Sequence, residues 1–301
     1  MSLLKEVWIT DAQEQLFENY TFLDHSVNHA PFVVGSVVHV PAAGTAPATV
    51  RNRSSLPATV TSRTDAMVSY SVDSRSTDPV VVPDLEAFQL SYDKRQSVMG
   101  QHLEKLMADA VRDVVQTWSP TLGVRLVRTS GSPSTLSLAP GATGNRKAIA
   151  LADVSNLARK FDEDNMPQEG RFLMLNPAQY YELFSLDQLL RADVMGRATL
   201  PKGAITQLFG FNIMVKPTLP VYSNAATPVL QDVGAATAFT DNLCALAWHK
   251  SAVARAIGGI EVYENEKDAT FYGDVISASL FAGGCKLRTS QAGVAALVQA
   301  A

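Results

Sequence analysis

Cysteine, charge and long apolar runs are all scarce in this chain of 301 residues. Its two cysteines, Cys244 and Cys285, lack the spacing of a metal-binding pair, and nothing else suggests a disulfide framework. Every apolar run is shorter than the roughly 18 residues that a membrane span needs. The acidic, amphipathic N-terminus does not suit a signal peptide. The simplest expectation is a soluble protein made in a reducing cytoplasm.

The charge balance argues against a nucleic-acid binder. Charged residues make up only 18% of the chain, and the formal net charge is −4. A protein that binds nucleic acid tightly normally shows a basic excess or a basic stripe. Neither is present, so we expect no sequence-specific nucleic-acid recognition. The 47% hydrophobic content is still enough for one large core or two modest ones.

Motifs that carry chemistry are missing as well. No strand is followed by a GxxxxGK[ST] or GxGxxG loop, and neither a GxSxG elbow nor an HExxH pair occurs. His25 and His29 are four residues apart, but no third ligand is placed near them and Pro31 follows. The acidic run at 162–165 lacks the alternating spacing of a calcium loop, so it is better interpreted as a solvated helix end. We therefore expect no catalytic residue, no cofactor and no bound metal.

Two stretches of contrasting composition begin the chain. Residues 1–30 hold one lysine and five acidic residues, and their apolar pattern predicts an acidic arm with a short amphipathic helix near 10–19. Residues 32–82 contain no lysine and are rich in Val, Thr, Ser, Pro and Ala, which is typical of strands separated by turns. The predicted strands are 33–40, 58–62 and 67–72. Because a lone two-stranded ribbon is marginal in water, this segment should lie against something else.

The apolar period then changes to that of helices. Apolar side chains recur every three or four residues from Met99 to Trp118, which predicts a long amphipathic helix at about 94–117 that ends before Pro120. A second stripe predicts a helix at 151–164. The motif Asn176-Pro177-Ala178-Gln179 supplies a helix N-cap residue, a proline at the first helical position and a glutamine at the third. A third helix should follow it, to about residue 185.

Strands alternate with these helices in the second half. The predicted strands are 171–175, 208–215, 243–249, 260–264 and 275–280, of which the last two pair across 266–268. We predict a short helical turn at 251–256, whereas the small side chains of 287–298 indicate no definite element. No repeat of 20–50 residues is present, which excludes repeat architectures. The fold class is therefore α+β.

The arginines of the 32–82 segment have two interpretations. They belong either to a solvated loop or to a surface that contacts the acidic arm of a neighbouring copy, because the two segments carry opposite charge. Exposed ion pairs contribute only about 0.2–1 kcal/mol each, but the same pairs repeated at every contact would set the register of an assembly. The residues of this hypothesis are Arg51, Arg53, Arg63 and Arg75 on one side and Glu14, Glu18 and Asp24 on the other.

The order of these parts resembles the tailed-bacteriophage major capsid (coat) protein family, whose fold is shared with encapsulins and the herpesvirus capsid floor. The resemblance covers most of the chain and rests on the order and spacing of several short sequence motifs. These motifs are Arg171-Phe172-Leu173-Met174-Leu175-Asn176-Pro177, Tyr180-Tyr181-Glu182-Leu183, Leu208-Phe209-Gly210-Phe211, Val215-Lys216-Pro217, Leu219-Pro220, Ala247-Trp248-His249-Lys250-Ser251-Ala252-Val253, Tyr272-Gly273-Asp274, Phe281-Ala282-Gly283-Gly284-Cys285-Lys286-Leu287-Arg288 and Gly293-Val294.

The resemblance implies a subunit of four parts. They are an N-terminal arm at 1–31, an extended β-ribbon loop at 32–83, a peripheral domain at 84–120 and 251–301 with a spine helix at 94–117, and an axial domain at 121–250. It also implies a non-enzymatic protein that assembles with itself in pentamers and hexamers into the icosahedral shell around a double-stranded DNA genome. The expected location is the virion capsid, assembled in the host cytoplasm without a membrane partner.

Two departures from the family pattern matter. The arm is too short for the helical scaffolding domain of some relatives, so scaffolding would be a separate protein or absent; portal and decoration proteins are further possible partners. The ribbon has no lysine, so it cannot form the Lys–Asn crosslink that some relatives use. The alternatives are an encapsulin-like compartment shell, a phage tail or baseplate protein, and a hydrolase or transferase whose site is assembled from scattered polar residues.

Overall fold

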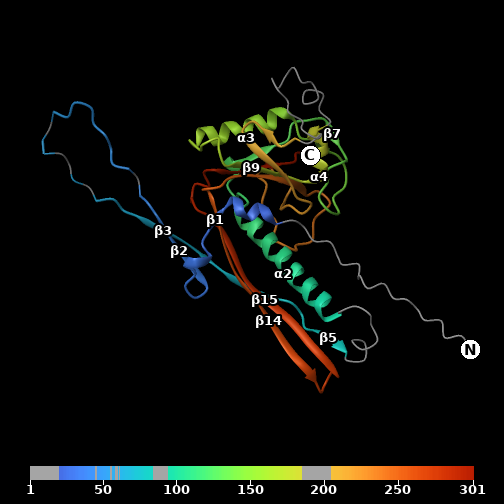
Figure 1. The fold of residues 1–301 in the computed structure, drawn as a ribbon. Coiled ribbons are helices and arrows are strands. Elements are labelled where there is room, and N and C mark those ends of the chain that lie inside the picture. Colours follow the sequence, from blue (N-terminus) through green and yellow to red (C-terminus); the bar gives the residue numbers. More distant parts are fainter. Residues whose placement is uncertain are drawn as a thin grey trace, which may run out of the picture.

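A mixed α+β fold with two main sheets and one long helix makes up the chain (Figure 1). The helix predicted near 10–19 and most of the strand predicted at 58–62 lie outside the described residues, and Val60 and Ser62 are not in a strand. Among the described helices, none has both the length and the apolar character needed to span a membrane. The computed structural model describes residues 20–44, 46–54, 56–57, 60, 62–83, 94–184 and 205–301.

The long helix α2 (Lys94–Trp118) confirms the prediction from the apolar stripe and packs against both sheets. Its middle part buries Leu106 and Ala110 against one strand of the five-stranded sheet. Its last turns bury Val114 and Trp118 against the seven-stranded sheet. One amphipathic face thus joins the two halves of the molecule, because the stripe is long enough to cover a part of each.

The seven-stranded sheet forms the larger core. Its order is β10-β11-β9-β13-β16-β6, with β12 paired to β13. The central strand β9 pairs in parallel with β11 and antiparallel with β13, and β16 pairs antiparallel with β13 and in parallel with β6. The strands are β6 (Leu126–Arg128), β9 (Arg171–Leu175), β10 (Gln207–Leu208), β11 (Phe211–Val215), β12 (Val221–Tyr222), β13 (Asn242–His249) and β16 (Val294–Val298).

Both faces of this sheet are covered, which is why its strands read as continuous apolar runs. Leu173 and Leu175 of β9 face α3 (Leu151–Glu163) and α4 (Pro177–Phe184), whereas Phe172 and Met174 face the end of α2. Helices α2 and α3 lie where the apolar periodicity predicts them, and α4 lies where the capping motif at 176–179 predicts it. At the start of α4, Asn176 Oδ1 accepts a hydrogen bond from the Ala178 N–H at 3.0 Å, as the predicted cap requires.

The five-stranded sheet is built on a long antiparallel hairpin of β14 (Val253–Asp268) and β15 (Gly273–Lys286). On the far side of β15 lie β4 (Asp73–Ser76) and β5 (Val80–Pro83), both antiparallel to it. On the outer side of β14, the short β1 (Val27–Asn28) pairs in parallel with only two residues. The sheet order is therefore β1-β14-β15 with β4 and β5 at the other edge.

The remaining elements are short. The ribbon consists of β2 (Val37–Ala42) and β3 (Ala66–Ser71), which form a two-stranded antiparallel sheet. A second small sheet, β7 (Pro133–Ser134) with β8 (Arg146–Lys147), lies beside the larger core. The 3-10 helices are η1 (Thr21–His25), η2 (Ala30–Phe32) and η3 (Gly123–Arg125).

Of three sequence-based predictions for residues 208–280, two are wrong and one is confirmed with different bounds. Residues 208–215 form a hairpin instead of one strand, because Phe209 and Gly210 have φ values of 48° and 80° and reverse the chain. The helical turn predicted at 251–256 is mostly the beginning of β14. The pairing of 260–264 with 275–280 is confirmed, but the strands are longer than predicted and turn at 269–272 instead of at 266–268.

The segment 287–298 also differs from its prediction. Its small side chains suggested no definite element, yet Val294–Val298 forms β16 in the interior of the seven-stranded sheet. Ala295 and Ala296 are almost fully buried there. Small residues fit this position because α3 on one face and neighbouring strands leave little space.

Candidate assembly surfaces

The base of the ribbon is anchored to the five-stranded sheet. Val38 and Val72 pack on Ala256 of β14 in a small buried cluster. His29, just before η2, donates its N–H to the Arg255 carbonyl at 2.7 Å, and its Nδ1 lies 3.2 Å from the Tyr70 hydroxyl of β3. These contacts hold the two ribbon strands at the body of the subunit.

Beyond this base the loop between β2 and β3 projects away from the body (Figure 1). It carries three large apolar side chains that are mostly in solvent: Val50 is 57% exposed, Leu56 81% and Val60 95%. The described part of the loop buries none of its residues. A projecting loop with exposed apolar side chains adds little to the stability of a single subunit, so its side chains are available for contacts with another molecule.

Several of the residues predicted to contact a neighbour are engaged within the subunit. Arg63 pairs with the exposed Asp65, two residues away, at 2.6 Å. Arg75 of β4 forms an ion pair with Asp113 of α2. Asp24 accepts from Arg255 at 2.9 Å, which ties η1 to β14. Glu14 and Glu18 lie outside the described residues. The structure therefore does not bring the predicted set together.

Arg51 and Arg53 have a different environment. Both are exposed, on either side of Asn52, whose φ of 51° places it in the left-handed region of a tight turn. Neither forms an ion pair with a described residue. The turn thus presents two cations at the end of the ribbon, where they are free to meet charges on a neighbour.

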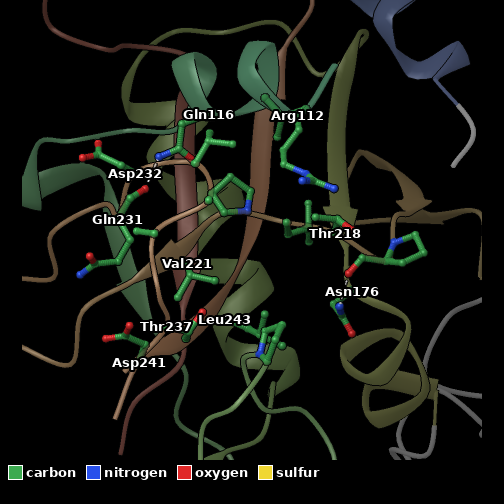
Figure 2. A pocket seen from close by; sticks show the side chains of 18 of the residues that line it. Arg112, Gln116, Asn176, Thr218, Val221, Gln231, Asp232, Thr237, Asp241 and Leu243 are labelled. Atoms are coloured by element: carbon green, nitrogen blue, oxygen red, sulfur yellow. Dashed lines mark hydrogen bonds between the residues drawn. The ribbon is translucent and has the colours of Figure 1, made fainter. Parts of the chain in front are cut away.

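A cleft of about 320 Å³ lies between α2 and the loops that surround β12. Figure 2 shows Arg112 and Gln116 entering it from α2, with Val221 and Leu243 deeper in the cleft. Its lining combines apolar residues such as Leu219 and Leu243 with polar ones such as Asn176 and Asp241. Sequence reasoning missed this cleft because its lining comes from segments that are far apart in the chain and share no motif.

The polar groups around the cleft mostly hold its own loops. Gln116 donates its side-chain amide to the Gln231 carbonyl. Asn176 Nδ2 donates to the Pro217 carbonyl at 2.7 Å, and Asp241 Oδ2 accepts from the Ala238 N–H at 2.8 Å. The lining contains neither histidine nor cysteine. The cleft therefore offers shape and apolar area to a partner, and no activated nucleophile.

The groups that could carry chemistry elsewhere are buried in ways that favour their neutral forms. Burial raises the pKa of the Cys285 thiol to about 11 and also raises the pKa of Cys244. His25 stacks on Phe172 with ring centres 4.1 Å apart, and the Nδ1 of His29 faces the Tyr70 hydroxyl. No cluster of three or more metal-ligating side chains occurs among the described residues.

Comparison with known proteins gives a clear result for the fold. No protein-family model matches the chain, and no curated protein matches its sequence. Solved structures of phage and GTA capsids, in contrast, match it over nearly its full length. The mixed α+β arrangement of one long helix and two main sheets is thus the fold of these capsid chains, as the resemblance of the short sequence motifs predicted.

Three of these structures illustrate the likeness. A chain of the capsid of cyanophage P-SCSP1u has a TM-score of 0.71 and 18% identity, over 98% of this chain and 92% of its own. A chain of Mycobacterium phage Che8 has a TM-score of 0.67 and 18% identity, over 98% and 97%. A chain of the native GTA particle capsid has a TM-score of 0.66 and 10% identity, over 99% and 96%. Nearly every part of this chain therefore has a counterpart in them.

Proposed function

We propose that this chain is the major capsid protein of a tailed phage, which self-assembles into the icosahedral shell around a double-stranded DNA genome. The observation that carries the proposal is the full-length likeness to capsid chains, which extends from the N-terminal turn through the projecting ribbon to the last strand. A projecting ribbon adds little to the stability of a monomer, whereas in a shell it can contact neighbouring subunits.

The mechanism is repeated surface complementarity. Each copy presents two different surfaces, so that head-to-tail contacts between identical subunits close into rings of five and six. Assembly in this way needs no catalytic group, which agrees with the neutral, buried thiols of the described core. A slightly acidic subunit also suits a DNA container, because the packaged DNA should not adhere to the inner wall.

The parts of the subunit have separate roles in this proposal. The seven-stranded sheet, most of it within 121–250, forms the axial domain near the five- and six-fold axes. The peripheral domain consists of residues 84–120, which include α2, and the greater part of 251–301, which includes the β14–β15 hairpin. The pairing of β16 with β13 supports assigning residues from 294 onward to the axial side. The arm at 1–31 and the ribbon at 32–83 then reach neighbouring copies.

The partners follow from the same reasoning. The subunit's main partner is itself, in pentamers and hexamers, and the shell is the virion capsid. Portal and decoration proteins, and a scaffolding protein if the shell uses one, would be further partners. Within the described ribbon, strands β4 and β5 belong to the body of the subunit, since both pair with β15. The freely projecting part is therefore shorter than 32–83.

Electron microscopy of the expressed protein tests the proposal. The protein, alone or with the scaffolding partner from its own genome, should form closed shells with five- and six-fold rings, and shells from infected cells should contain double-stranded DNA. Shells that enclose an enzyme instead of DNA would identify an encapsulin-like compartment. Open tubes or single rings would identify a tail or baseplate protein, and a compact monomer under all conditions would contradict every assembly role.

A further inference from the structure

Residues 20–29 form a strap across the joint between the two main sheets, and we call this segment the N-terminal strap. Phe22 and Leu23 of η1 are buried with side chains of α2 and the seven-stranded sheet. Further along, Val27 and Asn28 of β1 pair with the edge of β14 in the five-stranded sheet. Figure 1 shows the strap, in blue, beside the end of α2. The strap therefore touches both halves of the molecule.

His25 anchors the first part of the strap to the larger sheet. Its ring is stacked on Phe172 of β9, with the ring centres 4.1 Å apart and the planes 15° from parallel. Its carbonyl accepts the indole N–H of Trp248 at 2.9 Å. A flat stack on a buried aromatic favours the neutral imidazole when no carboxylate accompanies it into the site.

His29 anchors the other end of the strap to the ribbon base and the smaller sheet. Its backbone N–H donates to the Arg255 carbonyl at 2.7 Å, and its Nδ1 lies 3.2 Å from the Tyr70 hydroxyl. The residue is only 9% exposed. Burial raises the pKa of Tyr70, so its hydroxyl stays protonated and can donate to Nδ1 of a neutral imidazole. The two imidazoles thus hold opposite ends of the same strap.

The surroundings of both imidazoles disfavour a positive charge. Burial lowers the pKa of His25, the positive Lys250 lowers it further, and Asp24 opposes them. Asp24 is itself paired with Arg255 at 2.9 Å. Burial also lowers the pKa of His29, and no carboxylate within the described part of the chain forms an ion pair with it. A protonated imidazole is therefore more stable in water than in either docked site.

The other titratable groups beside the strap do not change this balance. Lys216 Nζ lies 5.7 Å from the centre of the Phe22 ring, so it adds a further positive charge. Cys285 is the titratable neighbour of Tyr70. Burial raises the pKa of this thiol to about 11, which leaves it neutral near pH 7.

Docking of the strap is therefore linked to proton binding. The ordinary pKa of histidine is 6.5, and the docked strap holds both pKa values below it. Below about pH 6.5 a released strap binds more protons than a docked one, so acid shifts the equilibrium toward release. Each histidine contributes at most about tenfold per pH unit, and the two together at most about 100-fold. Well above pH 6.5 both are neutral in either state, and the equilibrium no longer changes with pH.

We propose that the N-terminal strap is an acid-sensitive switch, which stays docked across the joint of the two sheets while His25 and His29 are neutral and is released when both are protonated. Phe22 and Leu23 set the strength of the docked state, and the imidazoles make it depend on pH. Release removes one of the contacts that fix the ribbon base to the body. The inference concerns a single subunit, so it goes beyond the proposed function and does not depend on it.

Tryptophan fluorescence of the unassembled subunit reports the position of the strap. Trp118 and Trp248 both pack on Phe22, so release should expose them to water and shift their emission to longer wavelengths. Trp8→Phe leaves these two as the only tryptophans. Between pH 7.5 and pH 5 the emission of this variant should shift reversibly, while its far-ultraviolet circular dichroism and its cooperative thermal transition are retained.

Histidine variants in the same background assign the switch. His25→Gln combined with His29→Gln should make the emission independent of pH over this range, and each single substitution should weaken the pH dependence. His39→Gln, at an exposed position of β2, and His249→Gln, at a buried position outside the strap, are matched controls that should keep the shift.

Hydrogen exchange of the wild-type chain gives a second measurement that needs no substitution. The His29 amide is protected by its bond to the Arg255 carbonyl. After correction for the intrinsic exchange rate, its protection factor should fall by about tenfold or more between pH 7.5 and pH 5. The amides in the interior of β13 should keep theirs. If the double histidine variant is already undocked at pH 7.5, this measurement decides.

Three results would overturn the inference. The first is an emission and a His29 protection factor that stay constant down to pH 5 in a folded subunit. The second is a loss of circular dichroism in the same step as the emission shift, because the strap then does not move separately from the rest. The third is a shift that persists unchanged in the double histidine variant. None of them bears on the capsid role, which electron microscopy of assembly tests by itself.

Discussion

Trp118 lies where the long helix, the larger sheet and the N-terminal turn meet. Its side chain is fully buried. Its ring centre is 5.8 Å from that of Trp248 and 6.2 Å from that of Phe22, and its indole N–H donates to the Ala254 carbonyl at 2.9 Å. One residue thus connects α2, β13, η1 and β14. Its loss should affect the whole subunit and not one element.

Replacing Trp118 with alanine should lower the free energy of unfolding by about 3–5 kcal/mol, because a large aromatic is removed from a close-packed site. Urea denaturation of the unassembled subunit measures this. Trp118→Phe should lose less, since it keeps most of the apolar contact and leaves only the Ala254 carbonyl without its donor. Val124→Ala, at a position 71% exposed, should stay within about 0.5 kcal/mol of the wild type. Equal midpoints for Trp118→Ala and Val124→Ala would contradict this account of the core.

Three histidines make the subunit sensitive to acid. Burial lowers the pKa of His25, His29 and His249 below the ordinary value of 6.5. Below about pH 6.5 the unfolded chain therefore binds more protons than the native one, and the free energy of unfolding falls as pH decreases. Well above that pH all three histidines are neutral in both states, and their contribution no longer changes with pH.

Thermal unfolding of the unassembled subunit between pH 7.5 and pH 5 measures this effect. The midpoint temperature should fall as the pH passes below 6.5. His29→Gln should make the fall shallower, because one of the three groups no longer titrates while a side-chain amide can still face the Tyr70 hydroxyl. A midpoint that rises on acidification, in wild type or variant, would show that these histidines gain protons on folding.

At the scale of elements, the ribbon separates folding from assembly. Ala42 and Ala66 are directly paired at the outer end of β2 and β3, so the loop at 43–65 can be replaced by a two-residue turn without moving either strand. The shortened chain should keep the circular dichroism and unfolding midpoint of the wild type, because the described loop residues are not buried. Electron microscopy should find no closed shells.

The choice of boundaries matters in this experiment. A longer deletion that reaches residue 76 would remove β4, whose residues pair with Ser279–Ala282 of β15. It would also remove the ion pair between Arg75 and Asp113. Such a variant should be less stable and serves as the contrast. If the short deletion unfolded the subunit, or if closed shells still formed without the loop, the assigned roles would be wrong.

The helices could be predicted from sequence because their apolar stripes are long and their ends are marked. Pro120 follows the end of α2, and the Asn176-Pro177 motif marks the beginning of α4. The ribbon strands around residues 38 and 70 were also predictable from their β-branched residues and flanking prolines. For the candidate surfaces, Arg51 and Arg53 are exposed, whereas Arg63 and Arg75 form ion pairs within the subunit. The contact of these arginines with a neighbouring copy stays a prediction.

The secondary-structure predictions that failed did so because tertiary contacts outweighed the local preferences of the sequence. The start of β14 contains Ala254 and Ala256, good helix formers, but pairing with β15 decides its structure. Val294–Val298 has no strand-like alternation because both faces are buried.

For the assembled molecule, the composition predicts a shell without covalent links between subunits. The ribbon segment 32–82 has no lysine to supply an amine, and both cysteines are buried and unpaired within the subunit. Boiled mature shells should therefore run as one band near 32.4 kDa, with or without reducing agent. A ladder of covalent pentamers and hexamers in the wild type would contradict this. Stability must then come from packing and from ion pairs that salt screens, with a Debye length of about 8 Å at physiological ionic strength.

The position of β16 has a consequence for how fast subunits become available. Its residue Ala296 pairs with Leu126 on one side and with Leu246 on the other, so the sheet joins segments separated by much of the chain. Closing such large loops before their contacts form is slow. Until β16 inserts, β13 and β6 each have an uncovered side, and such edges promote aggregation. We therefore expect completion of this sheet to be a slow step in the folding of each new chain.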